Sequence, residues 1–298
     1  MPKSGFAPWK RGSLKGDLRM GTSLDKGWSE QLSPHAIQED LRTRWMGQSD
    51  VYCFDAVEST NSEAKRLARA GATEGTLVAA DAQTKGRGRL GRPWVSPPGE
   101  GLYMSLILRP DCPPDWLPRL TLTAGVAAAS AIRQMGIKPQ LKWPNDILLL
   151  QRKVGGILTE AVFDRKRVDF AILGIGVNVN AEEDDFPVSL RRLATSLRIS
   201  LGEPVSRIGL LQALLYQLEL WYETFCTGAF GEIRRSWGEL DVTLGKMVEV
   251  FLPDKRISGV AEDLSSDGAL LVRDKDGLHR IVAGDVVNCR LGEGSVKA

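Results

Sequence analysis

The sequence predicts an α+β protein in which a mixed β-sheet packed with helices is followed by a small β-barrel. Strand-like and helix-like segments alternate from about residue 50 to residue 180, which favours a sheet covered by helices. Residues 207–225 then carry an apolar stripe at helical spacing. From about residue 245 the strand candidates become short and are separated by the turn sequences SSDG and KDG, as in a small barrel.

The individual elements follow from the same signals. Ser33 as N-cap, Pro34 at the first helical position and Gly47 as a stop predict one short helix ahead of the sheet. Three further helices are predicted over residues 59–71, 117–136 and 207–225. Strands are predicted over residues 51–57, 76–83, 102–110, 140–150, 153–163 and 168–180, and in the barrel over 246–252, 256–264, 269–274 and 278–284.

These elements divide the chain into four parts. Residues 1–27 are rich in Gly, Lys, Arg and Ser without an apolar period, and we expect a disordered tail in which Met20 is an alternative start. Residues 28–48 form the short N-terminal helix, residues 49–243 the main domain that carries the candidate site, and residues 244–298 the barrel.

Composition excludes several classes of function. The net charge of +2 gives no global basic field, so any cationic chemistry is local. His35 and His279 are the two histidines, which disfavours a His-based zinc site or a Ser-His-Asp triad. Four scattered cysteines and the lack of an apolar run of membrane length favour a cytoplasmic protein with no membrane partner.

The stretch GRGRLGRPW, residues 86–94, is the strongest local signal. Its glycines match the spacing of a dinucleotide fingerprint, but Pro93 and the following PP pair prevent the helix that this fingerprint requires. We therefore expect a loop whose glycines let the backbone approach an anion that Arg87, Arg89 and Arg92 surround. The alternative is a solvated charged turn.

Two further stretches carry polar side chains at strand breaks. In LKWPNDILL, Pro144 interrupts a strand beside Lys142, Asn145 and Asp146. Mg²⁺ is usually held by one or two carboxylates with phosphate oxygens, which suits Asp146, and an amide such as Asn145 suits a base edge. The same residues are also common in plain turns.

In RKVGGILTE, Lys153 precedes Gly155 and Gly156 and could reach an acyl or phosphate oxygen, while Asn178 ends an apolar run. Taken alone, these two residues also fit a surface lysine and a turn former.

The three stretches in this order, with ESTN upstream and a C-terminal barrel, closely resemble the signature of the biotin protein ligases, of the type without a DNA-binding domain. The resemblance covers roughly residues 50–290. It implies an SH3-like barrel and a reaction in which biotin and ATP, with Mg²⁺, form biotinyl-5′-AMP and pyrophosphate. Biotin then passes to one lysine of the apo biotin carboxyl carrier protein of acetyl-CoA carboxylase or a related carboxylase. Monomer and homodimer remain open.

The resemblance also implies roles for single residues. The biotin site would comprise Ser59, Thr60, Asn61, Gln83, Arg87, Gly88, Arg89, Lys153, Gly155 and Gly156. The ATP site would comprise Arg89, Arg92, Trp94, Lys142, Asn145, Lys153 and Asn178, with Asp146 on the metal. Arg87, Arg89 and Lys153 would be catalytic, because a carboxylate and a phosphate 4 Å apart repel by about 4 kcal/mol at an effective dielectric near 20.

Two other functions compete with this one. A lipoate–protein ligase shares the architecture, but the cluster of Ser59, Thr60 and Gln83 favours a neutral ureido ring that needs directed hydrogen bonds. A nucleic-acid-binding or repressor protein could use the arginine loop and the barrel. The near-neutral charge and the single helix in residues 1–48 disfavour it, and no specific nucleic acid partner is expected.

Overall fold

The computed structural model describes residues 30–165, 167–252 and 255–288, so the predicted tail of residues 1–27 lies outside it. Its main element is a seven-stranded sheet with the strand order β1-β2-β3-β7-β6-β5-β4. The β1–β2 pair is parallel, and every other pair in the sheet is antiparallel. The predicted mixed sheet is therefore confirmed. The strands are β1 Val51–Val57, β2 Leu77–Gln83, β3 Gly101–Leu108, β4 Gln140–Lys142, β5 Asp146–Leu149, β6 Arg152–Asp164 and β7 Arg167–Asn178.

The single strand predicted over residues 140–150 is a hairpin. β4 ends at Lys142 and β5 begins at Asp146, and the two pair antiparallel. Pro144, which follows a cis peptide bond, has no backbone N–H to donate to a sheet, so the chain turns at residues 143–145. The turn projects the polar residues of this motif beyond the sheet.

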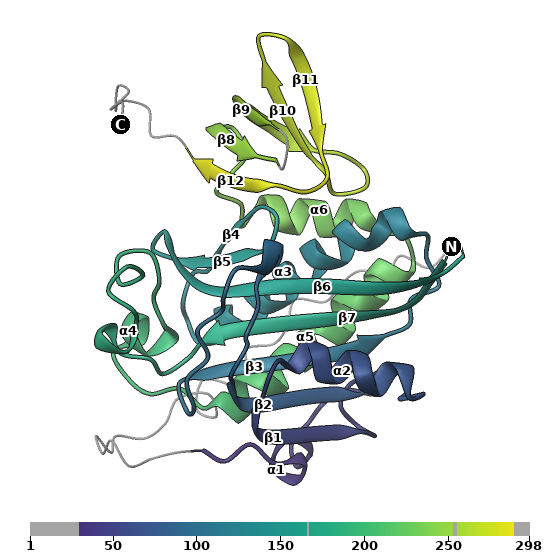
Figure 1. Ribbon diagram of the computed structural model, residues 1–298, viewed down its shortest axis with the longest axis vertical. Helices are drawn as coiled ribbons and strands as arrows, with labels where there is room; N and C mark the ends of the chain where they lie inside the picture. The colour runs from purple at the N-terminus through teal and green to yellow at the C-terminus, as the bar shows by residue number, and fades with distance from the viewer. Residues whose placement is uncertain (1–29, 166, 253–254, 289–298) are drawn as a thin grey trace.

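Helices cover both faces of the sheet (Figure 1). α2, Thr60–Arg69, packs on one face through Ala64, Leu67 and Ala68. The other face carries α3 Leu117–Arg133, α5 Arg207–Cys226 and α6 Phe230–Gly238, whose apolar residues join the main core. All eight residues of β3 are buried, as expected for a strand between two helical layers. A short helix, α4 Leu197–Leu201, and the 3₁₀ turns Arg89–Gly91, Pro114–Trp116 and Glu183–Asp185 complete this part.

The N-terminal helix is shorter than predicted. α1 spans Pro34–Gln38, and the Ser33 side chain accepts a hydrogen bond from the N–H of Ala36 as the predicted N-cap. The predicted continuation to Gly47 is wrong. Gly47 has a φ of +70° and follows an irregular segment.

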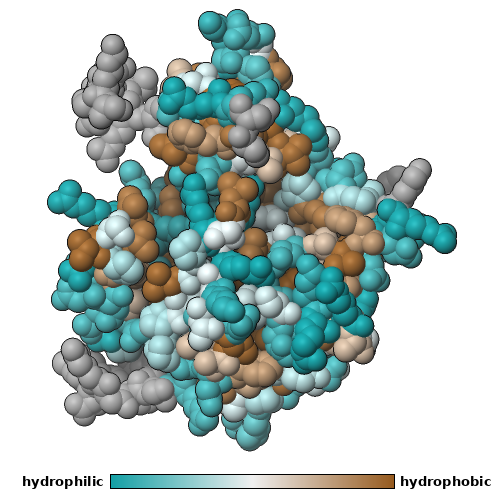
Figure 2. Space-filling view, viewed as in Figure 1, coloured by the Kyte–Doolittle hydropathy of each residue, from teal (hydrophilic) through white to brown (hydrophobic). Residues whose placement is uncertain are grey.

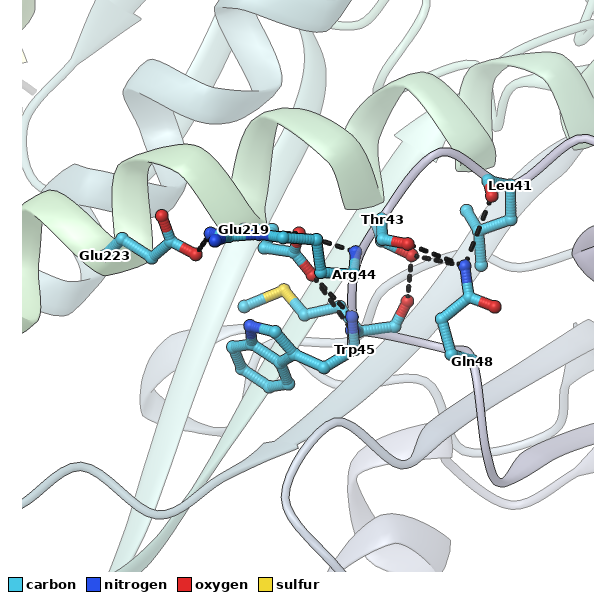
Figure 3. Close-up of polar contacts among 8 residues, drawn as sticks. Leu41, Thr43, Arg44, Trp45, Gln48, Glu219 and Glu223 are labelled. Atoms are coloured by element: carbon cyan, nitrogen blue, oxygen red, sulfur yellow. Dashed lines mark hydrogen bonds and ion pairs between the residues drawn. The ribbon is translucent and has the colours of Figure 1, made fainter.

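A buried carboxylate of α5 holds the irregular segment that follows α1 (Figure 3). Glu219 is 3% exposed and accepts hydrogen bonds from the backbone N–H groups of Arg44, Trp45 and Met46 at 2.7, 2.9 and 3.1 Å. Arg44 also forms an ion pair with Glu223. These contacts replace the hydrogen bonds that a longer helix would have made, and they fix the N-terminal segment to α5.

A separate antiparallel sheet follows, with the strand order β11-β10-β9-β8-β12. Its strands are β8 Met247–Phe251, β9 Arg256–Leu264, β10 Leu270–Asp274, β11 Gly277–Ile281 and β12 Asp285–Asn288. Within the described ranges no pairing joins β11 to β12, so the predicted barrel is observed as a five-stranded sheet without closure. It sits beside α6 and the β4–β5 hairpin (Figure 1), where Trp143 Nε1 donates to the carbonyl of Gly268 at 3.1 Å. Every helix in the described part of the chain is too short or too polar to cross a lipid bilayer.

Candidate active site

A cavity of about 600 Å³ lies between the main sheet and the C-terminal sheet. Its wall combines the start of α2, the arginine loop, the β4–β5 turn, the adjoining parts of β6 and β7, and β12. The predicted site residues come from five separate stretches of sequence, and the structure places all but one of them in this wall. They are Ser59, Thr60, Asn61, Gln83, Arg87, Gly88, Arg89, Arg92, Trp94, Lys142, Asn145, Asp146, Lys153, Gly156 and Asn178.

Gly155 is the exception. A Cβ there would lie 2.9 Å from the carbonyl oxygen of Gly176 and 3.2 Å from the side chain of Ile147. Glycine is therefore needed at position 155 for close packing within the sheet. The predicted contact of Gly155 with biotin has no support from the geometry.

The start of α2 presents hydrogen-bonding groups to one end of the cavity. Ser59 is the N-cap, but its side chain makes no capping bond, so the hydroxyl is not committed to the helix. The N–H and hydroxyl of Thr60 lie 2.9 and 3.2 Å from Gln83 Oε1, and Gln83 Nε2 donates to Ser96 at 3.0 Å. Ser105, buried behind them, lies 2.8 Å from the Thr60 hydroxyl. This chain of bonds fixes the orientation of the polar groups, as a directional ligand site requires.

Asn61 crosses the sheet surface next to this cluster. Its amide nitrogen donates to Glu160 at 2.8 Å and to the carbonyl of Leu158 at 3.2 Å. A Cβ on Gly174 would lie 2.0 Å from Asn61 Oδ1, so only glycine permits this approach. Asn61 is 4% exposed and closes the floor of the cavity.

The arginine loop folds back on itself over the cavity. The N–H of Gly88 donates to the carbonyl of Arg92 at 2.8 Å, and the N–H of Trp94 donates to that of Gly86 at 2.9 Å. Arg89 Nη1 donates to the carbonyl of Gly284 at 3.3 Å, and burial lowers the pKa of this guanidinium. The loop is therefore held closed by its own backbone and by the C-terminal sheet.

Lys153 occupies the centre of the cavity. Its ammonium nitrogen lies 2.5 Å from Asp146 Oδ1 and 5.5 Å from the centroid of the Trp94 ring. Gly156 and Gly176 form the floor below: a Cβ on Gly156 would lie 3.3 Å from Lys153 Cε, and one on Gly176 would lie 2.8 Å from Trp94 Nε1. The indole N–H of Trp94 is buried against Gly176 and has no acceptor among the described residues.

The opposite end of the cavity is lined by amides and a second lysine. Asn145 Nδ2 donates to the carbonyl of Ile157 at 2.8 Å, and Asn178 Nδ2 donates to that of Thr195 at 3.0 Å. Lys142 is half-buried, and desolvation lowers its pKa despite the nearby carboxylate of Asp146. The positive groups of this end and of the loop surround one space, which suits a polyanion.

The donor set around Asp146 bears on the predicted metal. Within the described ranges no group of three or more His, Cys, Asp and Glu side chains could hold an ion. Asp146 is a single carboxylate that already pairs with Lys153. Mg²⁺ commonly keeps several waters and takes phosphate oxygens with one or two carboxylates, so the residues fit an ion that enters with phosphate groups.

Sequence reasoning missed several residues of the wall. Phe251, Asp285 and Val287 come from the C-terminal sheet, more than seventy residues after Asn178, the last of the predicted site residues. Phe186, 8% exposed, supplies an aromatic surface near Asn178. These residues are isolated, either in short strands or in a polar connection. Their sequence surroundings therefore give no local signal for a ligand site.

Comparison with known proteins agrees with this geometry. The family model of the biotin/lipoate A/B protein ligases matches residues 53–178, and that of the biotin protein ligase C-terminal domain matches residues 243–287. The bifunctional ligase/repressor BirA of Bacillus spizizenii is 41% identical over 257 residues, which cover 86% of this chain and 79% of the relative. The biotin–[acetyl-CoA-carboxylase] ligase of Mycobacterium tuberculosis is 31% identical over 274 residues, which cover 88% of this chain and 98% of the relative.

A solved structure gives the same result. The biotin protein ligase from Aquifex aeolicus in complex with biotin and ATP matches with a TM-score of 0.69 and 32% identity, over 81% of this chain and 99% of that chain. Fold and site thus define an enzyme of the biotin/lipoate ligase type. Within that type, the chain belongs to the biotin protein ligase family.

Proposed function

We propose that this chain is an ATP-dependent biotin–protein ligase that forms biotinyl-5′-adenylate in the 600 Å³ cavity and then transfers biotin to a lysine of a carrier protein. The observation that carries the proposal is the arrangement of the cavity. A fixed neutral polar cluster around Thr60 and Gln83 occupies one end, and cationic groups occupy the middle and the other end, with Lys153 between them.

This arrangement suits both halves of the reaction. The polar cluster would bind the ureido ring of biotin through Ser59, Thr60 and Gln83, which sets the carboxylate of biotin toward Lys153. Arg89 and Lys153 would offset the repulsion between that carboxylate and the α-phosphate of ATP, and Mg²⁺ bound with Asp146 would neutralise pyrophosphate. Neither step needs a nucleophile from the protein, because biotin supplies it in the first step and the acceptor lysine in the second.

The partner follows from the relatives. Those from Mycobacterium tuberculosis and Paracoccus denitrificans are named biotin–[acetyl-CoA-carboxylase] ligases, which supports the apo biotin carboxyl carrier protein of such a carboxylase as acceptor. A cytoplasmic location fits a reaction that consumes ATP. Other relatives are named ligase/repressors, so DNA binding is a second function to test. A strong, steeply salt-dependent affinity for duplex DNA would support it.

The acceptor reaction tests the proposal. The purified protein is incubated with ATP, Mg²⁺ and the apo biotin carboxyl carrier domain of an acetyl-CoA carboxylase, with biotin or lipoate, and the carrier is analysed by intact-mass spectrometry. We expect a biotinyl adduct on one lysine with biotin and none with lipoate. A lipoyl adduct would overturn the assignment of the polar cluster, and the absence of both adducts would contradict the proposed function.

A further inference from the structure

A second, open cavity of about 420 Å³ lies on the outer side of α2, next to the active-site cavity. We call it the basic groove. It is lined by Ser62, Lys65, Arg66, Arg69, Arg87 and Glu160, so four of its six residues are cationic and one is acidic. Hydrophilic surface covers the region of α2 in Figure 2.

The helix geometry places these cations together. Ser62, Lys65, Arg66 and Arg69 recur at spacings of three and four residues, so they share one face of α2. The opposite face is the apolar one that packs on the sheet. Packing of α2 on the sheet therefore does not require the cationic face, and the charged side chains on this face can bind a partner.

Part of this charge is not neutralised within the protein. Arg66 forms an ion pair with Glu63 at 2.6 Å. Lys65, half-buried, and Arg69, exposed, have no ion-pair partner in the part of the chain that the structure describes. In a protein whose net charge is only +2, these two side chains give a local positive potential that attracts anionic groups.

Arg87 connects the groove to the active site. It lines both cavities, with Nη2 donating to the Ser62 hydroxyl at 3.0 Å and lying 3.9 Å from Glu160. A chain segment bound in the groove therefore lies one side chain away from the place where the proposed acyl group is held.

We propose that the basic groove docks an acidic segment of the protein that presents the acceptor lysine. The inference rests on the proposed function, because the second half-reaction requires a protein to bring an amine to the rim of the cavity. At this rim the enzyme offers uncompensated cations, so charge complementarity selects an acidic protein surface. Such a contact would speed the encounter and orient the acceptor, while the adenylation step would not use it.

Charge reversal on α2 tests the inference. The variant Lys65→Glu/Arg69→Glu is compared with the wild type in three assays: ATP–pyrophosphate exchange with biotin, biotin transfer to the apo biotin carboxyl carrier domain, and biotin transfer to hydroxylamine, which needs no docking. We expect unchanged exchange and unchanged hydroxamate formation. The KM for the carrier domain should rise about tenfold, with kcat retained and a weaker dependence on salt.

Two further variants keep the test selective. Arg133→Glu/Lys138→Glu makes the same change in charge at exposed cations of α3 and the segment after it, and it should leave the KM unchanged. The neutral variant Lys65→Gln/Arg69→Gln should give a smaller rise in KM than the charge reversal.

An unchanged KM, or an equal rise in the α3 variant, would overturn the inference. So would a loss of duplex DNA binding without a change in KM, since that result would assign the groove to nucleic acid. A wild type without biotin-dependent exchange would overturn the proposed function itself.

Discussion

The ammonium group of Lys153 contacts two groups that attract a cation. The carboxylate of Asp146 lies at 2.5 Å, and the centroid of the Trp94 ring lies at 5.5 Å. This keeps the ammonium group in the cavity centre before any ligand enters. Removing a preorganised charge of this kind typically costs about 10²–10³ in rate. We expect Lys153→Met to lower biotin-dependent ATP–pyrophosphate exchange by this factor, and Lys138→Met, at an exposed site, to have no effect. Exchange within about threefold of the wild type would contradict the role of Lys153.

Glu100 is a residue whose charge works against the fold. Burial raises its pKa above the ordinary value of 4.5, with a further contribution from Asp185, and its Oε2 is buried with no hydrogen-bond partner among the described residues. Below pH 4.5 both the folded and unfolded states carry the neutral acid. As the pH rises from 4.5 to the raised pKa, the unfolded state ionises while the folded state keeps its proton, so the free energy of unfolding falls, and above the raised pKa this loss is complete.

Glu100→Gln should therefore raise the Tm at pH 8 and leave it unchanged at pH 4. Thermal unfolding of the ligand-free protein at both pH values measures this difference. The control Glu239→Gln, at an exposed position, should show the same Tm difference at both pH values. A lower Tm for Glu100→Gln than for the wild type at pH 8 would contradict this account of the Glu100 carboxylate.

At the scale of elements, the arginine loop is held by β12. Arg92 forms an ion pair with Asp285, and Arg89 donates to the carbonyl of the preceding residue, Gly284. Because Arg92 is largely exposed, its pair is worth only about 0.2–1 kcal/mol.

Asp285→Asn should accordingly raise the rate of tryptic cleavage after Arg87 and Arg89 by about two- to fivefold in the ligand-free protein. Saturating biotin and ATP should reduce the difference, since the ligands would hold the loop instead. Glu249→Gln, which removes an exposed pair within β8 and β9, is the control. Equal cleavage rates in the wild type and Asp285→Asn would exclude the contact as a restraint on the loop.

The floor formed by β6 and β7 gives a second element-scale test. A Cβ at Gly176 would lie 2.8 Å from Trp94 Nε1, so Gly176→Ala should displace the indole and the loop that carries it. Misplacement by about 1 Å can cost about 10²-fold in rate, and we expect that loss in pyrophosphate exchange. Gly231→Ala in α6, where a Cβ meets nothing within 4 Å, should leave exchange unchanged. Normal exchange in Gly176→Ala would show that the indole has room to move.

At the scale of the whole molecule, the sequence predicted those features that depend on residues close together in the chain. Periodicity indicated the mixed sheet and its covering helices, and the motifs around Arg87, Asn145 and Lys153 converge on one cavity as their order suggested. It missed what depends on distant packing. Glu219 lies 173 residues or more from the backbone groups that it binds, and nothing in residues 33–47 signals that their helix must stop early.

The same limit applies to the part of the cavity wall that the C-terminal sheet supplies. Phe251 and Asp285 reach the cavity only because the C-terminal sheet docks against the β4–β5 hairpin through Trp143. That docking is a property of two folded units, and no spacing within either one encodes it. The role of the C-terminal sheet in holding the loop was therefore accessible only from the structure.

The most direct test of the account is ATP–pyrophosphate exchange by the purified protein with Mg²⁺, comparing biotin, lipoate and no acid. The account predicts exchange with biotin alone, because the polar cluster at Thr60 and Gln83 orients the ureido ring and the cations beyond it bind the phosphates. Exchange with lipoate instead would keep the fold and the adenylation chemistry but contradict the assignment of the polar cluster. Exchange with neither acid would contradict the central claim that this cavity forms an acyl adenylate.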